Sequence, residues 1–143
     1  MLTSTLPCGS SIILTEWDFD RLTELTHSPR YRATHAALLS GLKQELDRGE
    51  VVSPQKVSRN VVTMHSKLRV RDLKGYESGT YTLVYPDEAS INEGKISVLA
   101  PLGMALLGAR VGQTVAVSVP AGMRRLKIER ILYQPEAMGD YHL

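Results

Sequence analysis

The stretch PLGMALLGARVGQTV, Pro101 to Val115, decides how the second half of this 143-residue chain folds. A proline suited to the first position of a helix is followed by apolar residues and then by Gly108. A phosphate-binding loop would need a lysine and a hydroxyl residue directly after its second glycine, whereas Ala109 and Arg110 stand there. We therefore predict a short helix that closes at Gly108 and packs on a sheet, and not a nucleotide site.

The segments around this helix have the sequence character of strands. They are short, rich in β-branched residues, and several alternate between apolar and polar positions. We predict strands at residues 61–64, 67–73, 80–85, 95–99, 114–119 and 125–133. The last two are joined by a turn at 120–122, so we expect a mostly antiparallel sheet with one short helix.

The first third of the chain has a helical pattern instead. Thr15 precedes two acidic residues within one turn, as the N-cap of a helix does, and Pro29 ends this helix. A second run of leucines at helical spacing extends from about residue 32 to residue 48. Because the connection at 26–31 is short, we expect residues 15–48 to form an antiparallel helical hairpin.

These patterns together predict an α+β fold. The hairpin belongs to an N-terminal part, residues 1–52, and the sheet and its short helix to a domain at residues 53–143. At this length the chain can bury one compact core.

The composition narrows the class of protein. The chain is 43% hydrophobic and 22% charged, with a formal net charge of +2, which is typical of a folded domain and too small a charge to identify a partner. A single cysteine, Cys8, excludes an internal disulfide. We see no secretion signal and no apolar run long enough for a membrane span, so we expect a cytoplasmic protein without membrane contact.

The usual signatures of catalysis and metal binding are missing from the sequence. The four histidines, His27, His35, His65 and His142, include no pair at the i, i+4 spacing of a helical metal site. There is no Gly-x-Ser-x-Gly nucleophile motif. We expect no enzyme activity, no cofactor or metal, and no small-molecule substrate.

One strand carries a basic pattern. Lys67, Arg69 and Arg71 alternate with apolar residues, so that all three side chains should share one face. Evenly spaced cations can follow the phosphates of a nucleic acid, although such a row is more often a solvated strand face. A nucleic-acid-binding module that uses this face is therefore the alternative function.

The segment ISVLAPLGMALLGARVGQTVAVSVPAGMRRLKIERILY, residues 96–133, strongly resembles the C-terminal domain of the bacterial Gre transcript-cleavage factors. Three further stretches, NVVTMHSKLRVRDL, TLVYPDEA and YQPEAMGDY, are similar to the Rnk proteins, Gre-like proteins with a short N-terminal hairpin that are named as regulators of nucleoside diphosphate kinase. The resemblance extends over about residues 10–143.

This resemblance implies an FKBP-like sheet domain behind the helical hairpin. It also implies direct binding to bacterial RNA polymerase at the rim of its secondary channel. The serine and proline of the matching motif, which help to form that contact in Gre factors, correspond to Ser97 and Pro101, and Leu102 follows in the same segment.

Transcript cleavage by Gre factors depends on a long coiled coil that carries acidic residues at its tip. Here the longer predicted helix has about 17 residues and would be about 25 Å long. The predicted tip at 26–31 has no carboxylate, and its Arg30 would oppose a magnesium ion. We place the acidic residues Asp18, Asp20 and Glu24 in the stem, exposed to solvent. We therefore expect a polymerase-binding regulator that competes with Gre factors without stimulating cleavage, while its oligomeric state and its effect on nucleoside diphosphate kinase do not follow from the residues.

Overall fold

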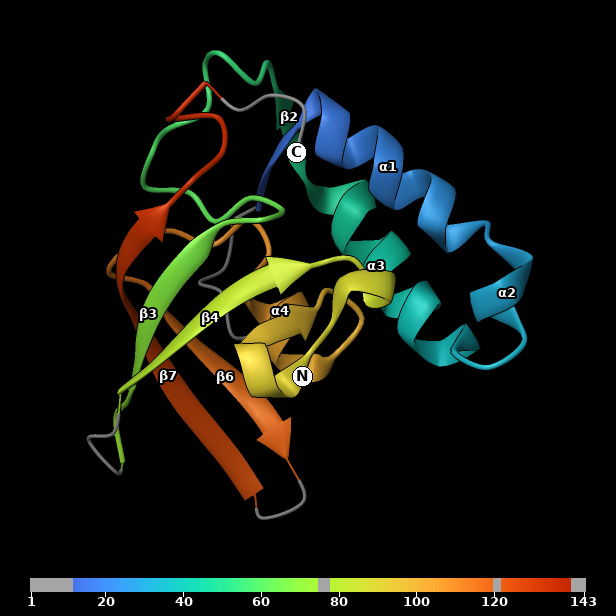
Figure 1. Cartoon of the computed structure of the whole chain (residues 1–143). Coiled ribbons are helices and arrows are strands. Elements are labelled where there is room, and N and C mark those ends of the chain that lie inside the picture. The colour runs from blue at the N-terminus through green and yellow to red at the C-terminus, as the bar shows by residue number, and fades with distance from the viewer. Residues whose placement is uncertain (1–11, 75–77, 120–121, 140–143) are drawn as a thin grey trace.

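The computed structural model of the chain describes residues 12–74, 78–119 and 122–139 (Figure 1). Cys8 and His142 lie outside the described residues. The elements follow in the order β1 (Ile13–Thr15), α1 (Glu16–Thr26), α2 (Pro29–Arg32), α3 (Ala36–Arg48), β2 (Glu50–Val52), β3 (Lys67–Asp72), β4 (Ser78–Val84), the 3₁₀ turns η1 (Pro86–Glu88) and η2 (Ile91–Glu93), β5 (Lys95–Ser97), α4 (Pro101–Leu106), β6 (Thr114–Val119) and β7 (Gly122–Tyr133). The predicted α+β class is confirmed.

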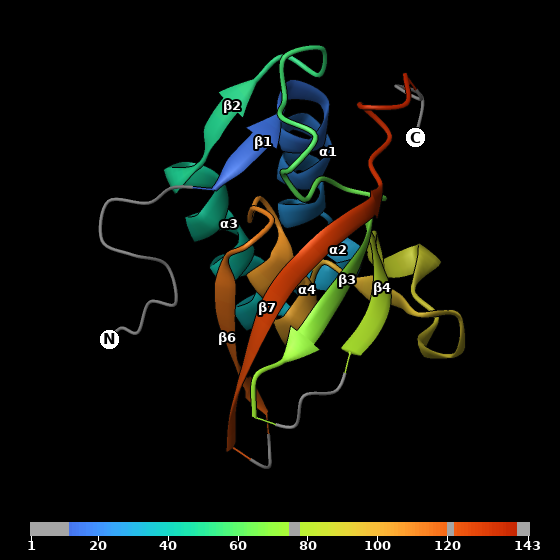
Figure 2. The same ribbon diagram turned by 90° about the vertical axis from the view of Figure 1, so that its left-hand side faces the viewer.

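The larger sheet has the strand order β5-β4-β3-β7-β6. The strands β4, β3, β7 and β6 are antiparallel to their neighbours in this series, as predicted. Figure 2 shows one face of this sheet toward the viewer and the helices behind it. The predicted turn at 120–122 lies mostly outside the described residues.

Residues 61–64, which we predicted as a strand, are buried without joining a sheet. Among the described residues, Val61 makes one isolated bridge and the segment continues as a loop. Its donors find other acceptors: the Val62 N–H bonds to the carbonyl of Ala109 at 2.8 Å, and the Met64 N–H bonds to a carboxylate oxygen of α1 at 3.0 Å. The strand prediction is wrong here because apolar side chains indicate burial, and buried donors can be satisfied without a ladder.

Two pairs of strands are parallel, which the sequence analysis did not predict. Strand β5 runs parallel to β4, because residues 85–94, with their two 3₁₀ turns, carry the chain back so that β5 begins beside Thr82. Strands β1 and β2 form a separate parallel pair directly before α1 and directly after α3. This pair ties together the two ends of the helical segment.

The helix boundaries differ from the prediction between α1 and α3. Thr15 caps α1 as predicted, since its Oγ1 accepts a hydrogen bond from the Asp18 N–H at 3.1 Å. The next helix begins at Ala36 and not near residue 32, because Pro29 takes the first position of a separate short helix, α2. Helices α1 and α3 pack against each other, and α2 forms the tip that joins them (Figure 1).

The helices and the sheet share one hydrophobic core. Leu22 of α1, Leu42 of α3 and Leu106 of α4 are buried in the same cluster as Leu68 and Ile128 of the sheet. This common core fixes the helical segment against the sheet, and the tip α2 therefore lies next to the turn that follows β4.

Candidate functional site

The three residues predicted to contact a partner lie together where β5 ends and α4 begins. Ser97 ends β5, and its Oγ and its carbonyl oxygen accept the N–H groups of Leu99 and Ala100, each at 3.0 Å. Pro101 is the first residue of α4 and is exposed, and Leu102 is half-buried against the core. The structure thus brings Ser97, Pro101 and Leu102 into one turn at the molecular surface, which we call the α4 edge.

A close backbone contact holds this edge in place. A Cβ atom added to Gly103 would lie 2.0 Å from the carbonyl oxygen of Ser97, so α4 packs directly on the end of β5. Gly108 follows the helix at φ +74°, a left-handed conformation that glycine adopts without strain. The two glycines of the 101–115 stretch therefore permit close packing and a turn, which agrees with the predicted core helix.

The α4 edge borders a cleft of about 500 Å³ whose other wall is the helical tip. Its lining combines Ser97 and Ala100 with Arg30 and Tyr31 of α2. Asp87 of η1 links the walls: the Tyr31 hydroxyl donates to its carboxylate, which raises the pKa of Tyr31, and the Arg30 guanidinium lies 3.1 Å from the same oxygen. Sequence reasoning missed this link, because residues 31 and 87 are 56 positions apart.

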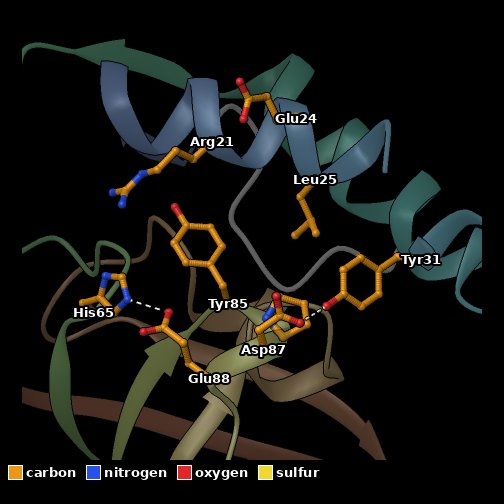
Figure 3. A pocket seen from close by; sticks show the side chains of 9 residues that line it. Arg21, Glu24, Leu25, Tyr31, His65, Tyr85, Asp87 and Glu88 are labelled. Carbon is orange, nitrogen blue, oxygen red and sulfur yellow. Dashed lines mark hydrogen bonds and ion pairs between the residues drawn. The ribbon is translucent and has the colours of Figure 1, made fainter. Parts of the chain in front are cut away.

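A second, larger cleft of about 590 Å³ lies on the other side of this link (Figure 3). The Arg21 guanidinium lies over the Tyr85 ring, 5.2 Å from its centroid, and the His65 ring meets Tyr85 edge-on. His65 Nε2 is 2.8 Å from a carboxylate oxygen of Glu88. We call this the tyrosine cleft; it is lined by Arg21, Glu24, Leu25, Tyr31, His65, Tyr85, Pro86, Asp87 and Glu88.

Two buried polar atoms lie beside this cleft. The hydroxyl of Tyr85 and Nδ1 of His65 are buried, and none of the described residues offers either atom a hydrogen bond. Burial, reinforced by the nearby charge of Asp18, raises the pKa of Tyr85 well above its usual value, so this hydroxyl stays neutral. Among the described residues, the Tyr85 hydroxyl therefore has no base within hydrogen-bond distance.

Asp18 is not on the exposed stem where we expected it. Its side chain is buried, one oxygen accepting the Met64 N–H at 3.0 Å and the other lying 2.8 Å from Arg21. Asp20 is exposed, as expected. The prediction for Asp18 is wrong because its partner, the backbone of residue 64, lies 46 positions away and leaves no local signal in the sequence.

The basic face lies elsewhere, on the outer side of β3. Lys67, Arg69 and Arg71 are all exposed on one face, as the alternation predicted. Arg69 and Arg71 both pair with Glu129 of β7, at 3.4 Å and 2.7 Å. The structure does not bring this face together with the α4 edge, since β4 lies between β3 and β5.

The described residues hold neither a cluster of metal ligands nor a membrane-spanning helix. Among residues 12–74, 78–119 and 122–139, no three His, Cys, Asp or Glu side chains are grouped as metal ligands would be. Within the same ranges, no helix has both the length and the apolar character needed to cross a membrane.

Part of the chain, including the α4 edge, matches the model of a known protein family. The family model for the C-terminal part of the transcription elongation factors GreA/GreB matches residues 56–133. A prokaryotic transcription elongation factor GreA/GreB from Nitrosomonas europaea has a similar solved structure, with a TM-score of 0.71 and 34% identity over 87% of this chain and 99% of that chain.

Curated relatives extend the similarity beyond the sheet. The regulator of nucleoside diphosphate kinase from Escherichia coli K12 is 39% identical over 134 residues, which are 93% of this chain and 97% of the relative. The transcription elongation factor GreA from Thermodesulfovibrio yellowstonii is 34% identical over 117 residues, 78% of this chain and 74% of the relative. The family resemblance seen in the sequence is thus confirmed, and the chain belongs to the GreA/GreB family, with similarity along nearly its whole length to a regulator of nucleoside diphosphate kinase.

Proposed function

We propose that this protein regulates transcription by binding bacterial RNA polymerase near its secondary channel, and that Ser97, Pro101 and Leu102 form the contact. The main observation in support is the α4 edge. Pro101 is exposed there on a turn that is held by the close backbone contact between Gly103 and Ser97. A rigid edge favours binding, because little conformational entropy is lost when a partner docks on it. The names of its relatives, transcription elongation factors among them, support polymerase as the partner.

We further propose that binding occurs without stimulation of transcript cleavage and in competition with Gre factors. Helices α1 and α3 have 11 and 13 residues, so neither exceeds about 20 Å. The tip between them, residues 27–35, contains no carboxylate that could hold a metal ion. Arg30 and Tyr31 of the tip are also bound to Asp87 of the same molecule. The helical segment therefore lacks both the reach and the ligands that cleavage would need.

The same proposal includes the finer details of the fold. Helices α1 and α3 would be a shortened form of the antiparallel helical hairpin of Gre factors, and residues 53–143 an FKBP-like domain behind the N-terminal part, 1–52. The start of the family match at residue 56 supports this division.

Substitution at the α4 edge tests the proposal. Ser97→Glu places a charge in the contact, and we expect it to weaken binding to core RNA polymerase about tenfold or more, since an interface desolvates that charge. Pro101→Ala should weaken it less, because it removes only the ring. Both variants should keep the wild-type circular dichroism, and Ser97→Glu should unfold at a somewhat lower urea concentration, because it loses the Oγ that accepts the Leu99 N–H. Excess Gre factor should displace the wild-type protein. Unchanged affinity in folded Ser97→Glu would contradict the assignment of this edge.

A second candidate function, nucleic-acid binding, is favoured by like charges that face each other across strands. Arg69 is paired in register with Arg130, and Arg71 with Lys127, although like charges directly opposite destabilise a sheet. Under this alternative, replacing Lys67, Arg69 and Arg71 by alanine should abolish duplex DNA binding, and the wild-type affinity should fall steeply with salt. Under the polymerase proposal, the same triple variant should bind core polymerase within about twofold of wild type, as expected for residues outside an interface.

A further inference from the structure

The tyrosine cleft has two aromatic walls. In Figure 3 the Tyr85 ring stands on one side of it and Tyr31 on the other, with Leu25 reaching down from α1 between them. Arg21 lies on the far side of the Tyr85 ring from Tyr31. The cleft therefore offers apolar and aromatic surface in a volume of about 590 Å³, enough for a large side chain.

Carboxylates dominate the charge of this cleft. Its lining contains one arginine, Arg21, against Glu24, Asp87 and Glu88. Arg21 is compensated by the carboxylate of Asp18 behind it, at 2.8 Å. The cleft is thus an acidic site on a chain whose formal net charge is +2.

Glu24 differs from the other two carboxylates of the cleft. Asp87 is paired with Arg30 of the tip, and Glu88 with His65. None of the described residues forms a hydrogen bond or ion pair with the Glu24 carboxylate, which is exposed and lies on α1 above Leu25, pointing away from it (Figure 3). A ligand that enters the cleft can therefore use Glu24 without breaking an existing pair.

These features select the chemical class of the ligand. An anion would be repelled by Glu24 and, more weakly, by the paired carboxylates of Asp87 and Glu88, and a purely apolar group would remove water from Glu24 without replacing it. A cation on an apolar stem suits both the aromatic rings and the carboxylate. Its stem packs on the rings, and its charge interacts with the ring faces and with the carboxylate. Arginine suits this site better than lysine, since its planar guanidinium stacks on aromatic rings and donates two hydrogen bonds to one carboxylate.

We propose that the tyrosine cleft receives an arginine side chain of the protein partner, with Glu24 as its carboxylate acceptor and Tyr31 and Tyr85 as its walls. The cleft shares Tyr31, Pro86 and Asp87 with the cleft at the α4 edge, so a partner docked there would extend into it. The inference rests on the proposed function in taking that partner to be RNA polymerase. It adds a second contact, on the far side of the Tyr31–Asp87 link.

The test needs no polymerase. Uniformly ¹⁵N-labelled protein is titrated with N-acetyl-arginine amide, and in parallel with N-acetyl-citrulline amide, which has nearly the same shape without the charge. We expect the arginine compound to shift backbone amides of residues 24–31 and 85–88 with millimolar affinity, and citrulline to have little effect. Glu24→Gln should weaken this binding about two- to fivefold, as expected for one partly exposed charge contact. Asp47→Asn, at an exposed acid on α3, should not change it.

Three results would overturn the inference: equal shifts with citrulline, shifts confined to other residues, or unchanged affinity in Glu24→Gln. Because the titration contains no polymerase, such a result would leave the proposal for the α4 edge standing. Conversely, a protein that binds the arginine compound in the cleft but does not bind polymerase would contradict only the proposed function. Glu24→Gln should also weaken polymerase binding, whereas Asp47→Asn should not.

Discussion

Replacing Gly103 by alanine is expected to lower the free energy of unfolding by about 3–5 kcal/mol, although alanine is by far the better helix former. The added methyl group would lie 2.0 Å from the carbonyl oxygen of Ser97 and 2.9 Å from its carbonyl carbon. Both are backbone atoms at the end of β5, so no side chain can rotate to make room. Helix α4 would have to move away from the sheet, and the α4 edge would change with it.

Urea unfolding of the two proteins measures this effect. Gly112→Ala is the matched control, because Gly112 has φ +90° but nothing lies within 4 Å of its added Cβ. That variant carries only the strain of a left-handed alanine, about 1 kcal/mol. If Gly103→Ala lost no more stability than Gly112→Ala, the close contact between α4 and β5 would be wrong. Any Gly103→Ala protein that stays folded should also bind polymerase more weakly than wild type.

The parts of the fold that could be predicted from the sequence are those specified by local patterns. Strands β3, β6 and β7 alternate over six or more residues, and Pro101 marks the first turn of α4. The predicted contact residues Ser97, Pro101 and Leu102 lie within six positions of one another, so one prediction of a strand end and a helix start placed all three together.

The missed features depend on contacts between distant positions. The parallel pairing of Ile13 with Glu50 joins two three-residue strands, which are too short to show a pattern. The Tyr31–Asp87 bond, which defines both clefts, links a tip to a loop, and neither segment has any sequence feature that identifies the other. Hydrophobic periodicity indicates which faces are buried, but it does not indicate which polar groups meet at the margin of the core.

Asp18 is the clearest case of such a polar group, and Asp18→Ala is expected to lower the free energy of unfolding by about 2–4 kcal/mol at pH 7. Most of this loss comes from the Met64 N–H, which is buried and would lose its acceptor. The ion pair with Arg21 adds little, because the Arg21 side chain is 37% exposed and water replaces its partner. Asp20→Ala, two residues further along α1, should change stability by less than about 0.5 kcal/mol, as exposed substitutions do.

The pH dependence of stability separates the charge of Asp18 from its role as an acceptor. Burial raises the pKa of Asp18 above its usual 3.8, and this effect exceeds the opposing effects of the Met64 N–H and of Arg21. The folded protein therefore holds this proton more tightly than the unfolded chain. The resulting stabilisation is fully present below pH 3.8 and is lost as the pH rises through the folded pKa.

Asp18→Asn keeps an oxygen that can accept the Met64 N–H but cannot titrate. The stability of wild type relative to Asp18→Asn should therefore be greatest in acid and should decrease as the pH rises toward neutrality. Urea unfolding of both proteins between about pH 3.5 and pH 7.5 measures this difference. The carboxyl of Glu136, whose pKa burial raises, is common to both proteins, and the smaller part of its shift that the charge of Asp18 causes changes the difference in the same direction. A difference that increased with pH would mean that the Met64 N–H and Arg21 together outweigh burial and hold the pKa of Asp18 down.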